Sequence, residues 1–375
     1  MPWFVWRHGR PLARMTRLGC VAVLGLPCLM AGHPAAADPV GTITEFRLTW
    51  PDGIEHSTHE LGFEPRPGGG IWVTGQNMNY LAHVTLDGTA HYVPMPDGSG
   101  PHGMDFDGQG RLWVSLEFAG EVVRLDEAGH IIQKIDVAMR PPGAPQPINP
   151  SPHAITFGPD GRTIWFTGKA TGTVGRIDPD GSVAHFALKT VGAVPIYLEV
   201  GPDRNIWGTE LVGNQILRVR PDGTVTEFPI PTANSRPIAI VPGPDGQSMW
   251  FSEEAGDNVA RIDMAGHITE YLVPHSGDNV ILAGLAFDRD GNLWTQMYAS
   301  QPNRYDDRDY VVRIDKAIQQ APPGDLSKVP ITYYRTPSRN TVMHRIKQGP
   351  DGNMWFTELN TDRLGRLTTG EPPAK

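Results

Sequence analysis

The chain has 375 residues, a formal net charge of −9 and 19% charged residues. It is therefore long enough for one to three globular domains and too acidic for a typical nucleic-acid-binding protein. Its 43 glycines and 36 prolines fall at regular spacing, which favours ordered turns over disorder. We expect a folded, turn-rich protein without a nucleic-acid partner.

The first 37 residues have the pattern of a secretory signal peptide. Four arginines precede an apolar run from Leu18 to Met30, which is too short to span a bilayer, and Ala35–Ala37 supplies small residues for cleavage. Removing this segment leaves 28 basic and 41 acidic residues, a net charge of −13, and no cysteine. We expect export to the periplasm or beyond, and a mature chain of residues 38–375 with no disulfide and no membrane span.

A strand–turn–strand unit recurs along the rest of the chain. In its fullest copy, residues 151–168, a Gly-Pro-Asp-Gly turn at 158–161 joins two segments rich in Ile, Phe, Thr and Trp, as half-buried strands are. A tryptophan marks the second strand of each copy, at intervals of 41 to 61 residues: Trp72, Trp113, Trp165, Trp207, Trp250, Trp294 and Trp355. Repeats of this length with four strands each are typical of propellers. We predict an all-β, seven-bladed β-propeller.

The long intervals between tryptophans contain insertions, at residues 140–149, 299–310 and 317–329. The last repeat ends at its third strand, near Leu367, without a fourth. The N-terminal segment Gly41–Phe46 matches the fourth strand of another repeat, Gly223–Phe228. We therefore predict that the N-terminal strand completes the last blade and closes the ring, which removes an open sheet edge.

Candidate site residues lie at one end of the first two strands of the blades. The first strand of a propeller blade lines the channel, and its start lies beside the end of the antiparallel second strand. At the start of the first strand, four blades that are consecutive in the closed ring carry histidine: His344, His59, His102 and His153. Near the end of the second strand, Glu117 and Glu358 follow the tryptophan. Imidazoles act as general bases or metal ligands, and carboxylates bind Mg²⁺, so the pattern predicts a site at this mouth.

A structural role is the simpler interpretation for any single one of these residues. A histidine at this place can bond backbone across the channel, and a glutamate after the tryptophan can be an ordinary polar strand end. Four adjacent histidines favour a functional site. Tyr197, Tyr298 and Tyr305 could stack on a ligand at the same mouth or be ordinary strand and loop aromatics.

The repeats resemble those of the virginiamycin B lyase (streptogramin lyase) family. The resemblance rests on Pro152–Gly161 with Ile164–Thr167, on Gly349–Glu358 and on Asn214–Arg218, and it extends over the mature chain. It implies a seven-bladed propeller with a Mg²⁺-dependent site at one mouth. It also implies an enzyme that opens a cyclic depsipeptide antibiotic by elimination at the ester C–O bond, without water.

The resemblance also implies roles for individual residues. His102, in Pro101–Met104, resembles the general base, and His153 resembles the second, substrate-contacting histidine; His59 and His344 would be further substrate contacts. Glu117 resembles a metal-binding glutamate, and Glu358 would be a second metal ligand. The family's other metal carboxylate lies two residues before the base, where this chain has a glycine, and the two histidine blades occur in the reverse order.

The first hypothesis is therefore an exported, magnesium-assisted C–O lyase with His102 as base and a substrate not specified by the sequence. The second is a non-catalytic secreted propeller that binds a glycan, peptide or protein at the same mouth. The third is a metal-dependent lactonase like the gluconolactonase propellers, which need a Glu, Asn and Asp set facing the channel. In each case we expect a monomer with a small-molecule, peptide or glycan ligand.

Overall fold

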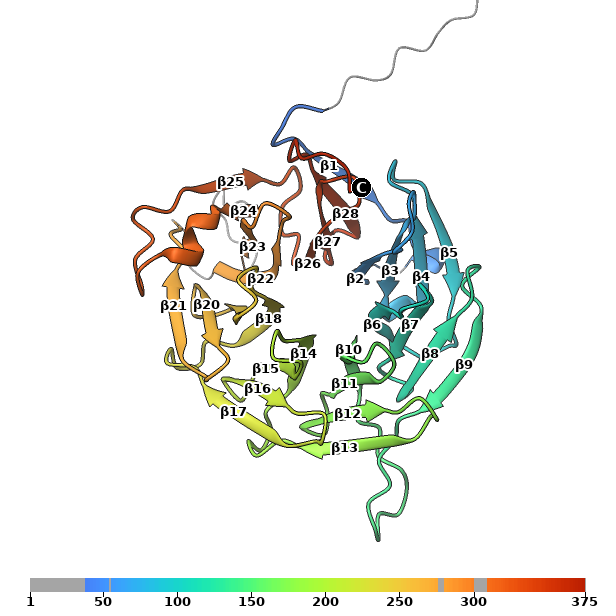
Figure 1. Ribbon diagram of the computed structural model, residues 1–375. Coiled ribbons are helices and arrows are strands. Elements are labelled where there is room, and N and C mark those ends of the chain that lie inside the picture. Colours follow the sequence, from blue (N-terminus) through green and yellow to red (C-terminus); the bar gives the residue numbers. More distant parts are fainter. Residues whose placement is uncertain (1–37, 54, 276–279, 300–308, 375) are drawn as a thin grey trace, which may run out of the picture. The chain divides into compact units, whose positions relative to one another are not determined.

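Seven four-stranded antiparallel sheets lie around a central axis (Figure 1). The computed structural model describes residues 38–53, 55–275, 280–299 and 309–374. In six sheets, the strand order from the channel to the rim follows the chain. The prediction of a seven-bladed β-propeller is confirmed. The predicted signal peptide, residues 1–37, lies outside the described residues.

Each blade runs from an inner strand at the channel to an outer strand at the rim. The first four blades are β2 (Thr58–Phe63), β3 (Ile71–Gly75), β4 (Tyr80–Val84), β5 (Ala90–Pro94); β6 (Pro101–Phe106), β7 (Leu112–Leu116), β8 (Glu121–Leu125), β9 (Ile131–Asp136); β10 (Pro152–Phe157), β11 (Ile164–Gly168), β12 (Thr173–Ile177), β13 (Val183–Ala187); and β14 (Pro195–Val200), β15 (Ile206–Glu210), β16 (Gln215–Val219), β17 (Val225–Pro229). The last three are β18 (Pro237–Pro242), β19 (Ser248–Glu253), β20 (Asn258–Asp263), β21 (Ile268–Leu272); β22 (Val280–Phe287), β23 (Leu293–Ala299), β24 (Tyr310–Ile314), β25 (Ile331–Arg335); and β26 (Met343–Gln348), β27 (Met354–Glu358), β28 (Arg363–Leu367), β1 (Ile43–Arg47).

Helix is confined to three short 3-10 turns in the described part of the chain. They are η1 (Pro51–Gly53), η2 (Gln76–Met78) and η3 (Lys316–Gln320). Within the described ranges, no helix has the length and apolar character needed to cross a membrane.

The N-terminal strand closes the ring, as predicted. Strand β1 pairs antiparallel with β28 and becomes the outermost strand of the last blade. Its Phe46 stacks on Trp355 of β27, with ring centroids 5.6 Å apart. The two ends of the propeller are therefore held together by a full set of strand hydrogen bonds and by an aromatic contact.

In five of the seven repeats, the indole N–H of the tryptophan donates to a carboxylate at or beside the turn, whereas the indole nitrogens of Trp165 and Trp250 are buried without a partner. Trp207 is fully buried, its indole Nε1 donates a 2.9 Å hydrogen bond to Asp203 of the turn, and its ring stacks on Phe228 of the outer strand. Trp355 makes the same bond to Asp351, at 3.1 Å. The turn aspartate thus gives a partner to an N–H that burial would otherwise leave unsatisfied. Burial of each ring stabilises its blade by roughly 4–6 kcal/mol, as an upper figure.

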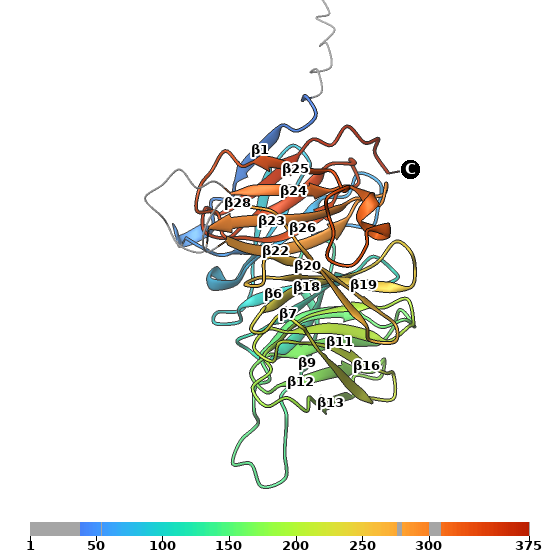
Figure 2. The ribbon, with the colours of Figure 1, turned by 90° about the vertical axis from the view of Figure 1, so that its left-hand side faces the viewer.

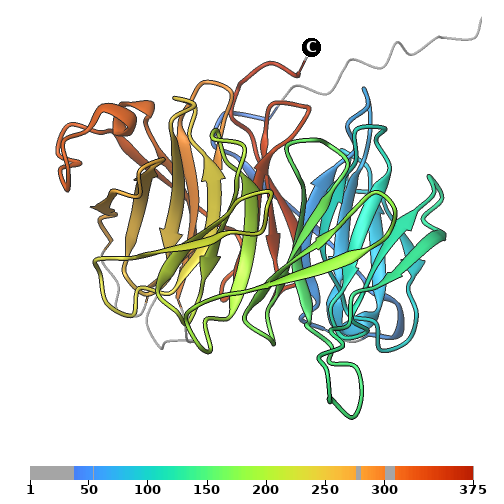
Figure 3. The ribbon, with the colours of Figure 1, turned by 60° about the horizontal axis from the view of Figure 1, so that its bottom comes forward.

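The insertions leave the ring intact. Residues 140–149 form a loop that projects beyond the blades (Figures 2 and 3). Residues 317–329 contain most of η3, whose Ile318 is fully buried in the same apolar cluster as Val312. Most of the 299–310 insertion lies outside the described residues.

Candidate functional site

In all seven inner strands, the register of pairing with the second strand shifts, as it does at a β-bulge. In β6, for example, the pairing register shifts between Pro101 and Met104, and in β10 it shifts between Pro152 and Ile155. A bulge bends the strand and redirects a side chain, and bulges are frequent beside functional sites. The four histidines all lie within these bulges, whereas the other three blades have apolar residues there: Ile196, Ile238 and Ala283. The bulge is therefore shared architecture, and the imidazole is what distinguishes four of the blades.

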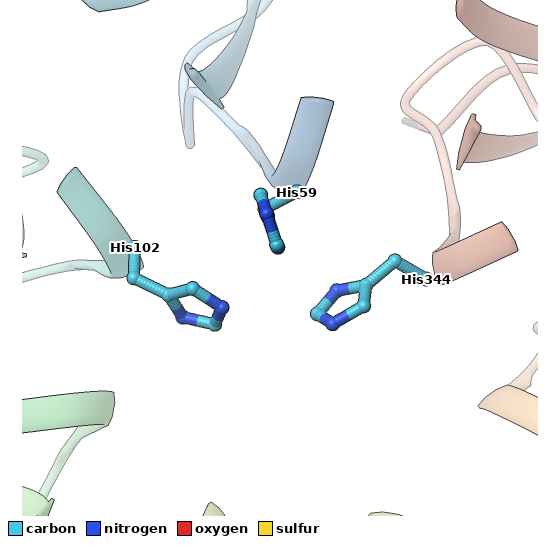
Figure 4. Close-up of side chains that lie close together, drawn as sticks. All are labelled: His59, His102 and His344. Atoms are coloured by element: carbon cyan, nitrogen blue, oxygen red, sulfur yellow. The ribbon is translucent and has the colours of Figure 1, made fainter. Parts of the chain in front are cut away.

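The structure brings the four imidazoles together at one mouth of the channel. Ring centroids lie 3.7 Å apart for His102 and His153, 5.0 Å apart for His59 and His102, and 5.0 Å apart for His59 and His344. Figure 4 shows three of the rings pointing into one shared space from neighbouring inner strands. The order around the mouth is the one that the closed ring predicts.

Hydrogen bonds fix the proton positions on two of the rings. Nδ1 of His102 lies 3.2 Å from the carbonyl oxygen of His153, and Nδ1 of His153 lies 3.0 Å from the carbonyl oxygen of Ile196. A carbonyl only accepts, so both Nδ1 atoms carry the proton and both Nε2 atoms keep a free lone pair. By contrast, Nδ1 of His59 and Nδ1 of His344 are buried without a hydrogen-bond partner.

Burial keeps all four rings neutral near pH 7. Desolvation lowers the pKa of His59 to about 3, with a further contribution from the positive charges of Arg345 and Lys169. Desolvation likewise holds the pKa values of the other three rings well below the ordinary 6.5. Unprotonated imidazoles are competent to accept a proton or bind a metal ion.

A layer of hydroxyl groups supports the bulges, and sequence analysis missed it. Ser115 Oγ accepts from the amide of Gly103 at 2.8 Å and donates to the carbonyl of His153 at 3.0 Å, which links two blades. Thr357 does the same between the amide of Arg345 and the carbonyl of His59. These residues stand two positions after the tryptophan, where six of the seven repeats have serine or threonine: Thr74, Ser115, Thr167, Thr209, Ser252 and Thr357. That recurrence was the available signal.

Glu117 lies beside two of the histidines. Ligand atoms of His102, Glu117 and His153 are all within 4.8 Å of one another. Its carboxylate accepts from Lys169 Nζ at 3.0 Å and from Gln76 Nε2 at 2.7 Å. Burial raises the pKa of Glu117, and Lys169 opposes that shift. Sequence analysis missed Lys169 and Gln76, although both stand four residues after a tryptophan, as Glu117 does.

The structure does not bring Glu358 to the histidines. It stands three residues after its tryptophan, and alternate residues of a strand point to opposite faces. Its Oε2 accepts from Thr361 Oγ1 at 2.6 Å. Burial, with added repulsion from Glu45, raises the pKa of Glu358 to about 8. Within the described residues, the groups spaced to hold a metal ion are His59, His102 and His344, and His102, Glu117 and His153.

Two other blades have the same pair of glutamates as Glu358 and Glu45. Burial raises the pKa of Glu210 to about 8, with repulsion from Glu227. It raises the pKa of Glu253 to about 7, and Glu270 adds to that shift. The glutamate three residues after the tryptophan is therefore a recurring partner of the outer strand in these blades.

The channel is filled below the histidines by charged residues. The Arg345 guanidinium forms an ion pair with Glu60 and lies 4.1 Å above the ring of Tyr197. These three residues border a cavity of about 70 Å³, too small for an organic substrate. Tyr298 is buried in an apolar cluster, and Tyr305 lies outside the described residues.

A model of the Virginiamycin B lyase family matches residues 37–305. The chain belongs to this family. It is 34% identical to the virginiamycin B lyase of Nocardia farcinica over 136 residues, which are 36% of this chain and 43% of that enzyme. The alignment thus spans less than half of that relative's length.

Solved structures of the family have the same architecture. The virginiamycin B lyase of Staphylococcus aureus superposes with a TM-score of 0.71 at 25% identity, covering 87% of this chain and 99% of that one. A catalytically inactive histidine-to-alanine variant of the same enzyme, solved with quinupristin, gives a TM-score of 0.69 at 25% identity with the same coverage.

Magnesium, which the family resemblance implies, remains a prediction for this member. Mg²⁺ prefers oxygen ligands. Among the described residues, Glu117 is the one carboxylate in the two ligand groups, and it already binds the ammonium of Lys169 and the amide of Gln76. The place of the family's other carboxylate is Gly100, at φ +60°. The remaining donors are nitrogens, so these residues do not fit Mg²⁺.

Proposed function

We propose that the mouth of this virginiamycin B lyase family member is the active site of a carbon–oxygen lyase, with His102 as general base. The observation that carries the proposal is the Nδ1–H bond of His102 to the carbonyl of His153, which leaves Nε2 as a fixed lone pair in a cluster of neutral rings. A base must be unprotonated and held in one orientation to remove a proton from carbon.

In the proposed reaction, His102 Nε2 takes a proton from the carbon next to a substrate carbonyl. The released electron pair forms a double bond to the neighbouring carbon, whose C–O bond breaks. The oxygen leaves with the bonding pair as a carboxylate, and the proton on His102 then passes to solvent. The products are an alkene and an acid, and no water is consumed.

Four neighbouring side chains are suited to assist this step. The Lys169 side chain is 36% exposed while its ammonium binds Glu117, so it lies where a substrate oxygen can reach it. A cation there stabilises the negative charge that develops on the carbonyl and on the leaving carboxylate. His153, His59 and His344 form the wall around the base and are proposed substrate contacts.

The proposed substrate class is a small ester, including cyclic depsipeptides such as the quinupristin found in the Staphylococcus aureus structure. The protein is incubated with quinupristin and a panel of acyl esters, and the products are examined by mass spectrometry. An elimination opens the ring without a change in mass, whereas a lactonase adds the mass of one water.

The matched variants are His102→Ala and His91→Ala, a histidine on the exposed side of β5. We expect His102→Ala to lose about 10²- to 10⁴-fold in rate and His91→Ala to keep full activity. A ligand that binds but is never turned over would favour the non-catalytic binding protein, and retained activity in His102→Ala would refute the assigned base.

Export is part of the proposal. It rests on the charged and apolar pattern of residues 1–37. Expression of the whole chain in a bacterium, followed by cell fractionation and N-terminal sequencing, should recover a protein that begins at Asp38. Recovery of the uncleaved chain from the cytoplasm would refute export.

A further inference from the structure

Three of the histidines form a group that includes the proposed base, His102, and excludes His153. We infer that His59, His102 and His344 bind a first-row transition metal ion of the Zn²⁺ class. The inference goes beyond the proposed function, because binding of the ion requires no substrate.

The geometry of the group suits a tetrahedral ion. One nitrogen from each ring lies within 4.8 Å of the others, and the rings point into a common space from the neighbouring strands β26, β2 and β6 (Figure 4). A tetrahedral ion with metal–nitrogen distances of about 2.0–2.1 Å holds its ligand nitrogens about 3.3–3.4 Å apart. Small rotations of the three side chains would bring the nitrogens from within 4.8 Å of one another to this spacing. The fourth coordination position of the ion would then face the channel.

Unpartnered nitrogens in the group point to a missing ligand. The Nδ1 atoms of His59 and His344 are buried and have no hydrogen-bond partner. A buried polar atom without a partner destabilises the folded protein, and a metal ion bound through these nitrogens would supply the partner. His102 is held differently, since its Nδ1–H donates to the carbonyl of His153. Metal-binding histidines usually make such a bond through their other nitrogen.

Local charge also favours this group over the one that contains Glu117. The Glu117 carboxylate is already paired with Lys169, so a second cation there would be repelled by the ammonium. Arg345 and Lys169 also place positive charge near the three rings, but Arg345 is paired with Glu60 and Lys169 with Glu117, which offsets part of that charge. A neutral set of three imidazoles is a known zinc site, whereas Mg²⁺ binds nitrogen poorly.

The ion and the proposed reaction use the same atom. Because Nδ1 of His102 carries a hydrogen-bonded proton, only its Nε2 can bind a metal, and Nε2 is also the proposed base. Metal binding therefore occupies the lone pair that proton removal needs. The metal-loaded protein is the inhibited form of the lyase, and chelation restores the base.

The test uses the whole purified protein after treatment with a chelator. Zn²⁺ binding is followed by titration calorimetry, and Co²⁺ binding by visible absorption, which reports the coordination number. We expect one ion per chain, a four-coordinate Co²⁺ spectrum and much weaker binding of Mg²⁺. Removing a residue that only hydrogen-bonds a metal ligand lowers metal affinity about 10–100-fold. His59→Asn and His344→Asn each remove a ligand itself, so each should lower Zn²⁺ affinity by about 100-fold or more.

The matched control is His153→Asn. His153 belongs to the other possible group, and the backbone carbonyl that holds His102 is unchanged in this variant. Circular dichroism checks that each variant is folded. Absence of Zn²⁺ binding, equal binding by His59→Asn and the native protein, or a larger loss in His153→Asn would overturn the inference. Because no substrate is present, these results stand whether or not the lyase assay succeeds.

Discussion

Replacing Glu358 by glutamine tests whether the glutamate after the tryptophan is a structural partner of the outer strand. The Glu358 side chain is fully buried, accepts from Thr361 and lies beside Glu45 of the closing strand β1. Burial and Glu45 raise the pKa of Glu358 from the ordinary 4.5 to about 8. In the folded protein it is therefore protonated at pH 7, and glutamine replaces it with nearly the same shape and hydrogen-bonding capacity.

The sign and size of the effect follow from that pKa. Between pH 4.5 and pH 8, the folded state holds a proton that the unfolded state releases, so this group's contribution is fully present below pH 4.5 and is lost as the pH rises. The loss is roughly 1.4 kcal/mol per pH unit, or about 2–3 kcal/mol between pH 5 and pH 7. Glu358→Gln lacks this titration. The stability of the variant relative to the native protein should therefore rise by about 2–3 kcal/mol over that interval.

The assay compares thermal unfolding of the two proteins at pH 5 and pH 7. For a folded unit of about 340 residues, the unfolding entropy is roughly 0.7 kcal/mol per kelvin, so the Tm difference should change by about 3–4 °C. Zn²⁺ binding is measured on the same samples and should not change. A Tm difference that is constant with pH would refute the buried-proton explanation. Loss of Zn²⁺ binding in Glu358→Gln would support the sequence-based expectation that Glu358 is a metal ligand.

Phe46→Ala removes the stack of the closing strand on Trp355, which should lower the free energy of unfolding by about 2–4 kcal/mol and speed proteolysis after Arg47. The control is Phe186→Ala, which removes the equivalent stack on Trp165 and should leave the bond after Arg47 protected. Equal protection in both variants would show that β1 does not depend on this contact. Lys169→Met removes the cation from Glu117 and so raises the pKa of that carboxyl further, which should destabilise the protein by about 1–3 kcal/mol at pH 7 and by less at pH 5. Addition of Glu117→Gln should restore stability; a loss that is independent of pH and of Glu117 would contradict this pairing.

Most of the fold could be predicted from the sequence because each blade repeats the same local chemistry. The turn at 158–161 shows the reason: Gly161 has φ +65°, and Asp160 bonds the following backbone amides. Arg204 adopts nearly the same φ, +61°, in the blade that lacks the glycine. The repeat, and not the single residue, therefore sets the turn. The partner of the orphan N-terminal segment was predictable for the same reason, since its sequence matched a missing strand.

The site was predictable in part. The start of each inner strand is fixed by the repeat, so the meeting of His344, His59, His102 and His153 followed from counting blades. The different surroundings of Glu117 and Glu358 could not be predicted in this way. The two residues stand four and three positions after their tryptophans, and a shift of one residue along a strand reverses the face to which the side chain points.

The sequence alone determined the ring, its closure and the blades that carry imidazoles, because these depend on local pattern and on the number of repeats. The tertiary structure decided which nitrogens are protonated, which carboxylate is neutralised and which ligands converge. Those properties depend on contacts between blades, such as the bond of His102 to the carbonyl of His153 and the pairing of Glu117 with Lys169. Such contacts join residues about 50 positions apart, and their distances and burial are set only when the ring is closed.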